Sequence, residues 1–224
     1  MEKTTRSSRK ASGKPSDENI KKAYISYLLT HGKQPPSVFK FCLDLGIKEN
    51  EFYSMAGSFE ALERAIWNDF IENTIKKLNA DKQFQSFTSR EKILTFYYAL
   101  LEELRSNRSY VLLSLKGYPK LEIVPAFLTS FKQTFIRFIE SVLNDGKNSG
   151  EIANRPYIEK GYPELFWVHM GFILLFWVKD GSPAFEKTDT AIEKSVNLSF
   201  DLIGKGAVDS ALDFIKFLYQ TTRN

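Results

Sequence analysis

The chain has 224 residues, of which 43% are hydrophobic, and a formal net charge of +4. This composition excludes a disordered or collagen-like chain and predicts a globular protein that can hold one large domain or two modest ones. The single cysteine, Cys42, excludes an intrachain disulfide and favours a cytoplasmic location.

The first 15 residues carry most of the excess positive charge, with five basic side chains against Glu2. They have no apolar stretch behind them, so they do not form a signal peptide. We expect residues 1–15 to be a flexible basic arm in which Arg6, Arg9 and Lys10 contact DNA phosphates. A solvated terminus without this role explains the same charges equally well.

Three helices are expected over residues 16–57, because apolar residues recur there at three- and four-residue steps. Ser16 is the expected cap of the first helix, which Gly32 ends. Ser37 can cap a short second helix over 37–45, and Gly46 supplies a tight turn into a third helix. This order predicts a tri-helical helix-turn-helix domain.

The remainder of the chain shows the same helical periodicity, and no useful length alternates like a strand, so the predicted fold class is all-α. A linking helix over 58–80 is followed by a larger C-terminal helical bundle over 81–224. Further helices are expected over 88–104, 108–116, 122–144, 157–179, 187–204 and 207–221, so that the whole chain has about nine or ten.

The longest apolar run, from Leu165 to Val178, has 14 residues and is too short for a bilayer span. We expect it to be a buried helix, and we expect no membrane partner.

The segment GKQPPSVFKFCLDLGIKENEFYSMAGSFEAL, residues 32–62, resembles the DNA-binding region of the TetR family without a gap. The positions that keep the residue of the family pattern are Gly32, Val38, Gly46, Tyr53, Ser58, Glu60 and Leu62. A weaker resemblance lies in NSGEI at 148–152 and FWVKDGSP at 176–183. The resemblance implies a divergent TetR-like transcription regulator, usually a repressor, which binds a palindromic operator in double-stranded DNA as a homodimer.

In that family the third helix enters the major groove, which implies that Phe52 anchors this helix to the core. Asn50 is then placed to read adenine, and Lys48 and Tyr53 to hold phosphates. The DNA-binding positions implied here are Ser37, Lys48, Asn50, Glu51, Tyr53 and Ser54. The chain departs from the pattern at Phe59, where the family has a phosphate-contacting Lys, and at the acidic Glu49 and Glu51.

The C-terminal domain is expected to bind a small apolar or aromatic ligand that relieves operator binding. Its expected lining is aromatic with a few polar tips: Tyr97, Tyr98, Tyr110, Phe127, Phe131, Phe135, Trp167 and His169. A core role is the more common one for a histidine like His169. The last long helices are expected to form the homodimer interface through Phe172, Phe176, Ile192, Val196, Phe200 and Ile203. Plain core packing is the alternative for each.

Catalysis is not expected, because the two histidines fall in different predicted domains and no metal-ligand spacing or phosphate loop is present. We therefore expect neither a cofactor nor a metal. The stronger rival is a TetR-like scaffold that has lost operator binding and acts through protein–protein interaction. A positive surface around Lys48, Asn50 and Tyr53 favours DNA, and an acidic or buried one favours the scaffold.

Overall fold

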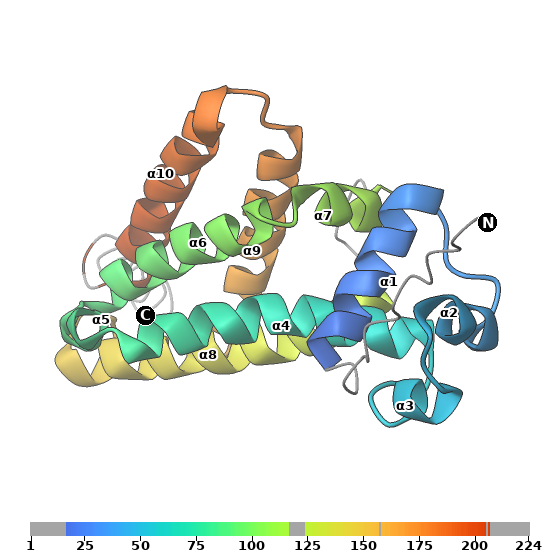
Figure 1. The fold of residues 1–224 in the computed structure, drawn as a ribbon. Coiled ribbons are helices and arrows are strands. Elements are labelled where there is room, and N and C mark those ends of the chain that lie inside the picture. Colours follow the sequence, from blue (N-terminus) through green and yellow to red (C-terminus); the bar gives the residue numbers. More distant parts are fainter. Residues whose placement is uncertain (1–16, 117–123, 157, 205, 207–224) are drawn as a thin grey trace, which may run out of the picture. The chain divides into compact units, whose positions relative to one another are not determined.

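The computed structural model describes residues 17–116, 124–156, 158–204 and 206. The regular secondary structure of these residues is helical, apart from one isolated bridge between Ile152 and Gly204. The expected all-α architecture is thus confirmed (Figure 1). Two compact units divide between Leu62 and Glu63. The α-helices among the described residues are α1 (Asp17–His31), α2 (Val38–Leu45), α3 (Glu49–Tyr53), α4 (Phe59–Ala80), α5 (Lys82–Ser86), α6 (Ser89–Arg105), α7 (Arg108–Leu115), α8 (Thr129–Ser149), α9 (Tyr162–Lys179) and α10 (Glu186–Ile203).

Aromatic rings fill the core of the first unit. Tyr24 of α1 stacks on Phe59 with ring centroids 5.2 Å apart, and Phe41 of α2 meets Phe59 edge-on at 5.7 Å. Phe52 of α3 is fully buried and lies 5.5 Å from the same ring. Phe59 therefore joins all three preceding helices, since an aromatic ring buries a large apolar area in one place.

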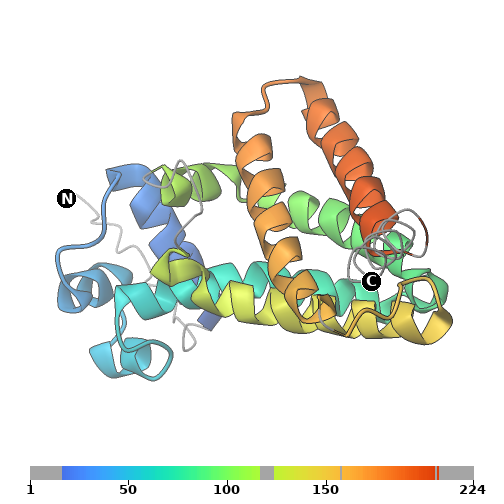
Figure 2. The same ribbon diagram turned by 180° about the vertical axis from the view of Figure 1, so that it is seen from behind.

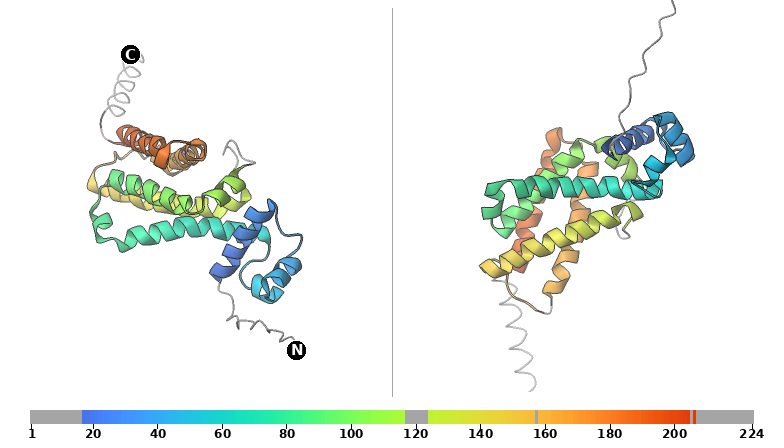
Figure 3. Two further views of the ribbon diagram at one scale, coloured as in Figure 1. Left: turned by 45° about the horizontal axis from the view of Figure 1, so that its top comes forward. Right: turned by 60° about the horizontal axis from the view of Figure 1, so that its bottom comes forward.

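The helices of the second unit pack in a closed set. The α6 helix packs against α8 and α10, and α9 packs against the same two helices. Figure 3 shows α9 and α10 lying beside each other. The second-unit part of α4 runs beside α8 in both Figure 1 and Figure 2, where Trp67 meets Phe131 at 6.0 Å and Thr134 donates to Asn68 Oδ1 at 2.9 Å.

Charged side chains hold several helix ends in the second unit. Asp180 accepts hydrogen bonds from Ser182 and from the backbone and hydroxyl of Thr188, and these bonds hold the pKa of its carboxyl well below the usual range. Glu151 accepts from the backbone N–H groups of Ser89 and Arg90, at the start of α6. These contacts satisfy N–H groups that have no partner within their own helix.

The structure corrects three boundaries expected from the sequence. The polar stretch after α4 contains the short helix α5, which Asp81 caps and whose Phe84 is buried. The α8 helix begins at Thr129, after a 3-10 turn over 126–128, and continues to Ser149, where Gly150 ends it in the left-handed conformation. The helix expected over 157–179 begins as α9 only at Tyr162, after a 3-10 turn over Glu159–Gly161. The helix expected over 207–221 lies outside the described residues.

The α9 helix and the turn before it, Glu159–Lys179, are long and apolar enough to cross a membrane by length and composition alone. No other helix among the described residues meets these criteria. Half of the most apolar 18-residue stretch within this segment is buried inside the unit, including Phe166, Trp167 and Ile173. A core helix with apolar residues on most sides has the same composition.

Candidate DNA-binding, dimerisation and ligand-binding sites

The helix-turn-helix is built by one cap and one glycine. Ser37 begins α2, because its Oγ accepts a hydrogen bond from the N–H of Lys40 at 3.1 Å. Gly46 ends α2 with a φ of 73°, which is costly for any other residue and explains its place in the turn. The N–H of Ile47 then donates to Cys42 O at 3.0 Å, so the turn into α3 is closed.

The α3 helix presents polar side chains outward and one ring inward. Phe52 is fully buried, whereas Tyr53 is 52% exposed. Lys48, Asn50 and Ser54 are also exposed, and the Ser54 hydroxyl donates to Glu51 O. The expected anchoring of α3 by Phe52 matches this burial.

Glu51 has a local structural role that the sequence pattern did not reveal. Its Oε2 accepts a hydrogen bond from the backbone N–H of Lys48 at 2.8 Å, so the carboxylate is turned back onto the start of α3. Glu49 lies in the same first turn. Burial, together with the charges of Glu49 and Glu51, raises the pKa of the Cys42 thiol. The start of α3 is therefore negative, while the first turn of α2 holds no acidic residue.

Phe59 is buried, with only 8% of its surface exposed. Its ring packs among Tyr24, Phe41 and Phe52, so it cannot contact a phosphate in this structure. The replacement of the family's Lys thus serves the core of the first unit. Arg6, Arg9 and Lys10 lie outside the described residues.

Most of the aromatic residues expected to line a ligand pocket are packed against one another in the second unit. Phe135 lies 5.9 Å from Trp167, and Phe131 lies 6.2 Å from it. The buried members of the expected set are Tyr97, Tyr110, Phe127, Phe131, Phe135 and Trp167, while Tyr98 is exposed and its hydroxyl donates to Asp189 O. This packing favours a core role for the buried rings.

His169 joins three helices through its two ring nitrogens. Its Nδ1 lies 3.0 Å from the Tyr97 hydroxyl of α6, and its Nε2 lies 2.7 Å from Ser195 Oγ of α10. Ser195 donates its own proton to Ala191 O, so we assign the Nε2–H tautomer, in which Tyr97 donates to Nδ1. Burial lowers the pKa of His169 to about 4, which keeps the ring neutral at pH 7.

Two buried polar atoms in the second unit make no hydrogen bond of ordinary geometry with the described residues: Trp67 Nε1 and the hydroxyl of Tyr110. The two rings are neighbours, with centroids 6.4 Å apart. Burial raises the pKa of Tyr110 above its usual range. An unsatisfied buried group lowers stability, which makes this pair a contrast to the bonded hydroxyl of Tyr97.

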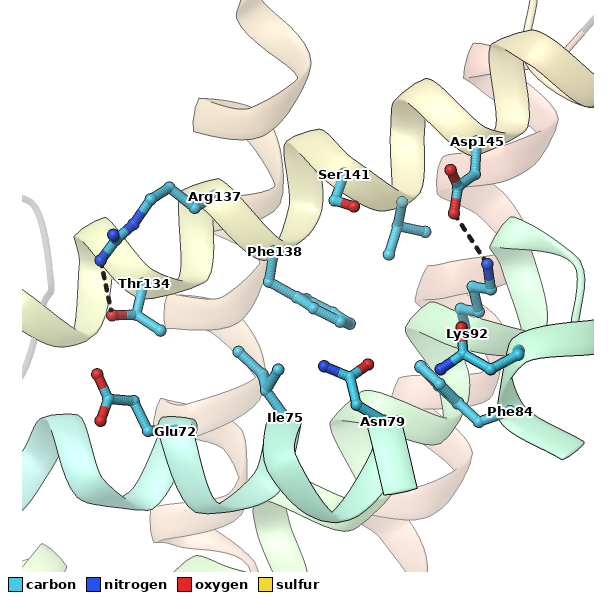
Figure 4. Close-up of a pocket in the computed structure, with 12 residues that line it drawn as sticks. Glu72, Ile75, Asn79, Phe84, Lys92, Thr134, Arg137, Phe138, Ser141 and Asp145 are labelled. Atoms are coloured by element: carbon cyan, nitrogen blue, oxygen red, sulfur yellow. Dashed lines mark hydrogen bonds and ion pairs between the residues drawn. The ribbon is translucent and has the colours of Figure 1, made fainter. Parts of the chain in front are cut away.

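A cavity of about 410 Å³ lies between α4 and α8, and we call it the α4–α8 groove (Figure 4). Its floor contains Ile75 and Phe138, which point toward each other, and Phe84 from α5. The Phe138 ring is backed by a stacked contact with Phe96 at 4.4 Å.

The rim of the groove is polar and carries both signs of charge. Arg137 donates to Thr134 at one end, and Lys92 pairs with Asp145 at 2.9 Å at the other (Figure 4). Glu72 lies opposite Arg137, and these two form no ion pair within the described structure. An apolar floor with polar ends suits an aromatic molecule that carries polar substituents.

The outer surface of α9 and α10 exposes large apolar side chains, which we call the α9–α10 face. Its members are Leu165, Val168 and Phe172 on α9, and Leu198 and Leu202 on α10, with exposed fractions between 49% and 68%. Phe176 is partly exposed. In contrast, Ile192, Val196, Phe200 and Ile203 lie in the core of their own unit. These four residues are expected at a dimer interface, and in this structure they are buried on the side of α10 that packs against α6 and α9.

Comparison with known proteins assigns the family. The family model described as the tetracyclin repressor-like C-terminal domain matches residues 92–218, more than half of the chain. No curated protein matches the chain. Among solved structures, a putative TetR-family transcription regulator from Shewanella sp. PV-4 shares 15% identity over 86% of this chain and 98% of its own, with a TM-score of 0.55. A regulatory protein in the TetR family from Rhodococcus RHA1 also shares 15% identity, over 85% of this chain and 98% of its own, with a TM-score of 0.50.

At this identity the solved structures show a common fold, and the sequence match to the C-terminal domain supplies the family. Together with the helix-turn-helix in the first unit, they establish that the chain belongs to the TetR family of transcription regulators.

Proposed function

We propose that the protein is a homodimeric DNA-binding transcription repressor whose operator binding is relieved by a small apolar or aromatic ligand. The observation that carries the DNA-binding part is the outward face of α3. Asn50, Tyr53 and Ser54 are exposed there, while Phe52 fixes the helix to the core. A helix held in this way can enter a major groove without losing its packing.

The charges assign different roles to the two short helices. The N-terminus of α2 has free N–H groups and no acidic side chain in its first turn, so Ser37 lies where a phosphate can bind. The N-terminus of α3 carries Glu49 and Glu51, which repel a phosphate. The backbone at the start of α3 is thus disfavoured for phosphate, and the phosphate contacts fall to the start of α2, the Lys48 ammonium and the Tyr53 hydroxyl, while Asn50 reads a base edge.

Dimerisation is assigned to the α9–α10 face. Leu165, Val168 and Phe172 recur at helical spacing on α9, and Leu198 and Leu202 are one turn apart on α10. A contiguous exposed apolar patch of this kind marks an interaction site, and a second copy provides the matching surface.

The ligand is assigned to the α4–α8 groove. Helix α4 is continuous from Phe59 in the first unit to Ala80 in the second, and Glu72, Ile75 and Asn79 of this helix line the groove. A molecule that binds between α4 and α8 is thus in contact with the helix that also joins the DNA-binding unit. It changes DNA affinity only by the difference in its own affinity for the two arrangements.

Selection from a pool of random DNA duplexes tests this function. The full chain is expected to enrich one duplex sequence, and Asn50→Ala is expected to weaken binding to it by roughly 5-fold to 150-fold, since a bidentate base contact contributes about 1–3 kcal/mol. Asn73→Ala, at an exposed position of α4, is the matched control and is expected to bind normally. Failure of the full chain to enrich any duplex at low salt would refute operator binding.

One observation favours a scaffold as the second candidate. Phe39 and Leu43 of α2 are about 60% exposed and lie one turn apart, on a unit whose third helix carries two acidic residues in its first turn. A protein partner would cover these side chains, whereas DNA would leave them in water. If the duplex selection fails, substitution of Phe39 by Ser tests this candidate, because loss of a co-purifying partner is then expected.

A further inference from the structure

A second cavity, of about 350 Å³, lies between α9 and α10. We propose that it binds an uncharged apolar molecule enclosed between two copies of the chain, so that this ligand and the dimer stabilise each other. The inference rests on the proposed dimer, but it concerns a site distinct from the α4–α8 groove. The side chains that argue for it are Leu165, Phe166, His169, Ser199, Leu202 and Arg155.

The chemical class follows from how the polar atoms of the lining are used. His169 has hydrogen-bonding contacts at both ring nitrogens, and Ser199 donates to Ser195 O at 2.8 Å. The guanidinium of Arg155 donates to Leu202 O and Gly204 O at 2.8 Å each. A charged or strongly polar ligand would have to displace these bonds, whereas an apolar ligand meets a surface made mainly of Leu165, Phe166 and Leu202.

The position follows from the rim of the cavity. Leu165 and Leu202 line the cavity and are also 62% and 53% exposed, and Ile158 beside them is 48% exposed. The first two belong to the α9–α10 face, so a second copy that covers this face also closes the mouth of the cavity. The volume lies within the range of about 300–1,000 Å³ that is typical of small-molecule sites, and it exceeds what a single side chain fills.

Thermodynamic linkage predicts whether the ligand tightens or loosens the dimer. A molecule that binds only in the closed cavity must tighten the dimer, whereas a molecule that competes with a partner's side chain must loosen it. The probe is 1-decanol, and sedimentation equilibrium of the full chain measures the dimer dissociation constant. With two sites per dimer and decanol at about ten times its site dissociation constant, the dimer dissociation constant is expected to fall roughly a hundredfold.

Two variants locate the effect. Ser199→Phe fills the cavity from α10 and is expected to abolish the response to decanol while the dimer persists; Ser199→Leu serves the same purpose if the larger ring prevents folding. Ser141→Phe, which fills the α4–α8 groove instead, is the matched control and is expected to keep the response.

Three results would overturn this inference: a dimer that decanol loosens, a dimer that decanol leaves unchanged, or tighter binding of decanoate than of decanol. The last would show that Arg155 recruits an anion. These results differ from failure of the proposed function, because a chain that remains monomeric without any probe removes the dimer itself.

Discussion

Protonation of His169 is expected to destabilise the second unit below pH 6.5. The ring is neutral in the fold, because burial lowers its pKa to about 4 from 6.5. Between pH 6.5 and 4, the unfolded state therefore binds a proton at His169 that the folded state does not bind. The stability that the neutral ring contributes is fully present above pH 6.5 and is lost as the pH falls toward 4. A shift of this size corresponds to about 3 kcal/mol, which we reduce to about 2–3 kcal/mol for partial exposure of the ring.

Urea denaturation followed by tryptophan fluorescence measures this effect in the second unit alone, because Trp67, Trp167 and Trp177 are the three tryptophans of the chain and all lie there. The wild type and His169→Gln are compared between pH 7 and pH 4.5 at one protein concentration. Carboxylates titrate in the same range, but they contribute equally to both proteins. His31→Gln, which changes the other histidine of the chain, is the control and is expected to follow the wild type. Parallel pH profiles for the wild type and His169→Gln would refute the reasoning.

Five further substitutions, two of them comparison variants, test the packing. Tyr97→Phe is expected to lower the free energy of unfolding by about 1–3 kcal/mol, because it leaves His169 Nδ1 without its partner. Tyr110→Phe removes an unsatisfied hydroxyl and is expected to be neutral or stabilising. Equal losses for the two variants in urea denaturation would contradict this. Gly146→Ala places a Cβ 2.6 Å from Ile152 Cδ1 and from Ser89 Oγ, so it is expected to lower the free energy of unfolding by about 1–3 kcal/mol. Gly161→Ala meets open space and is expected to change this free energy by less than about 0.5 kcal/mol. A larger loss for Gly161→Ala than for Gly146→Ala would contradict the close approach. Phe59→Lys restores the family residue but buries a charge, so it is expected to lower the unfolding free energy of the first unit by about 3 kcal/mol or more and to weaken DNA binding. Hydrogen exchange of the first unit and a duplex titration measure the two effects. Stronger DNA binding by a fully folded variant would contradict this prediction.

The helical fold was predictable because its signals are local. Gly32 and Gly46 both adopt positive φ at the helix ends where the sequence places them. A capping box from Thr88 to Glu91 begins α6, so this helix starts where the range 88–104 expects it. Such signals depend on neighbours in the chain, so they survive without knowledge of the tertiary structure.

Features that depend on distant contacts were not predictable. Phe84 makes the polar stretch after α4 into a helix only because α5 can bury it in the second unit. The side of α10 that faces the core was assigned to the dimer interface, because Ile192 and Leu198 are both apolar and the sequence does not reveal which one its own unit covers. In the sequence, Phe59 indicated only the loss of a phosphate contact. Its packing role depends on rings that three other helices contribute.

The proposal that two copies bind one DNA site is tested most directly by the mass of the protein–DNA complex. Sedimentation of the full chain with its enriched duplex is expected to give two chains per duplex. Val168→Glu, at a position of the α9–α10 face that is 68% exposed, is expected to abolish this complex while helix content is unchanged. A complex of one chain per duplex, or full affinity of Val168→Glu for the same duplex, would contradict the account.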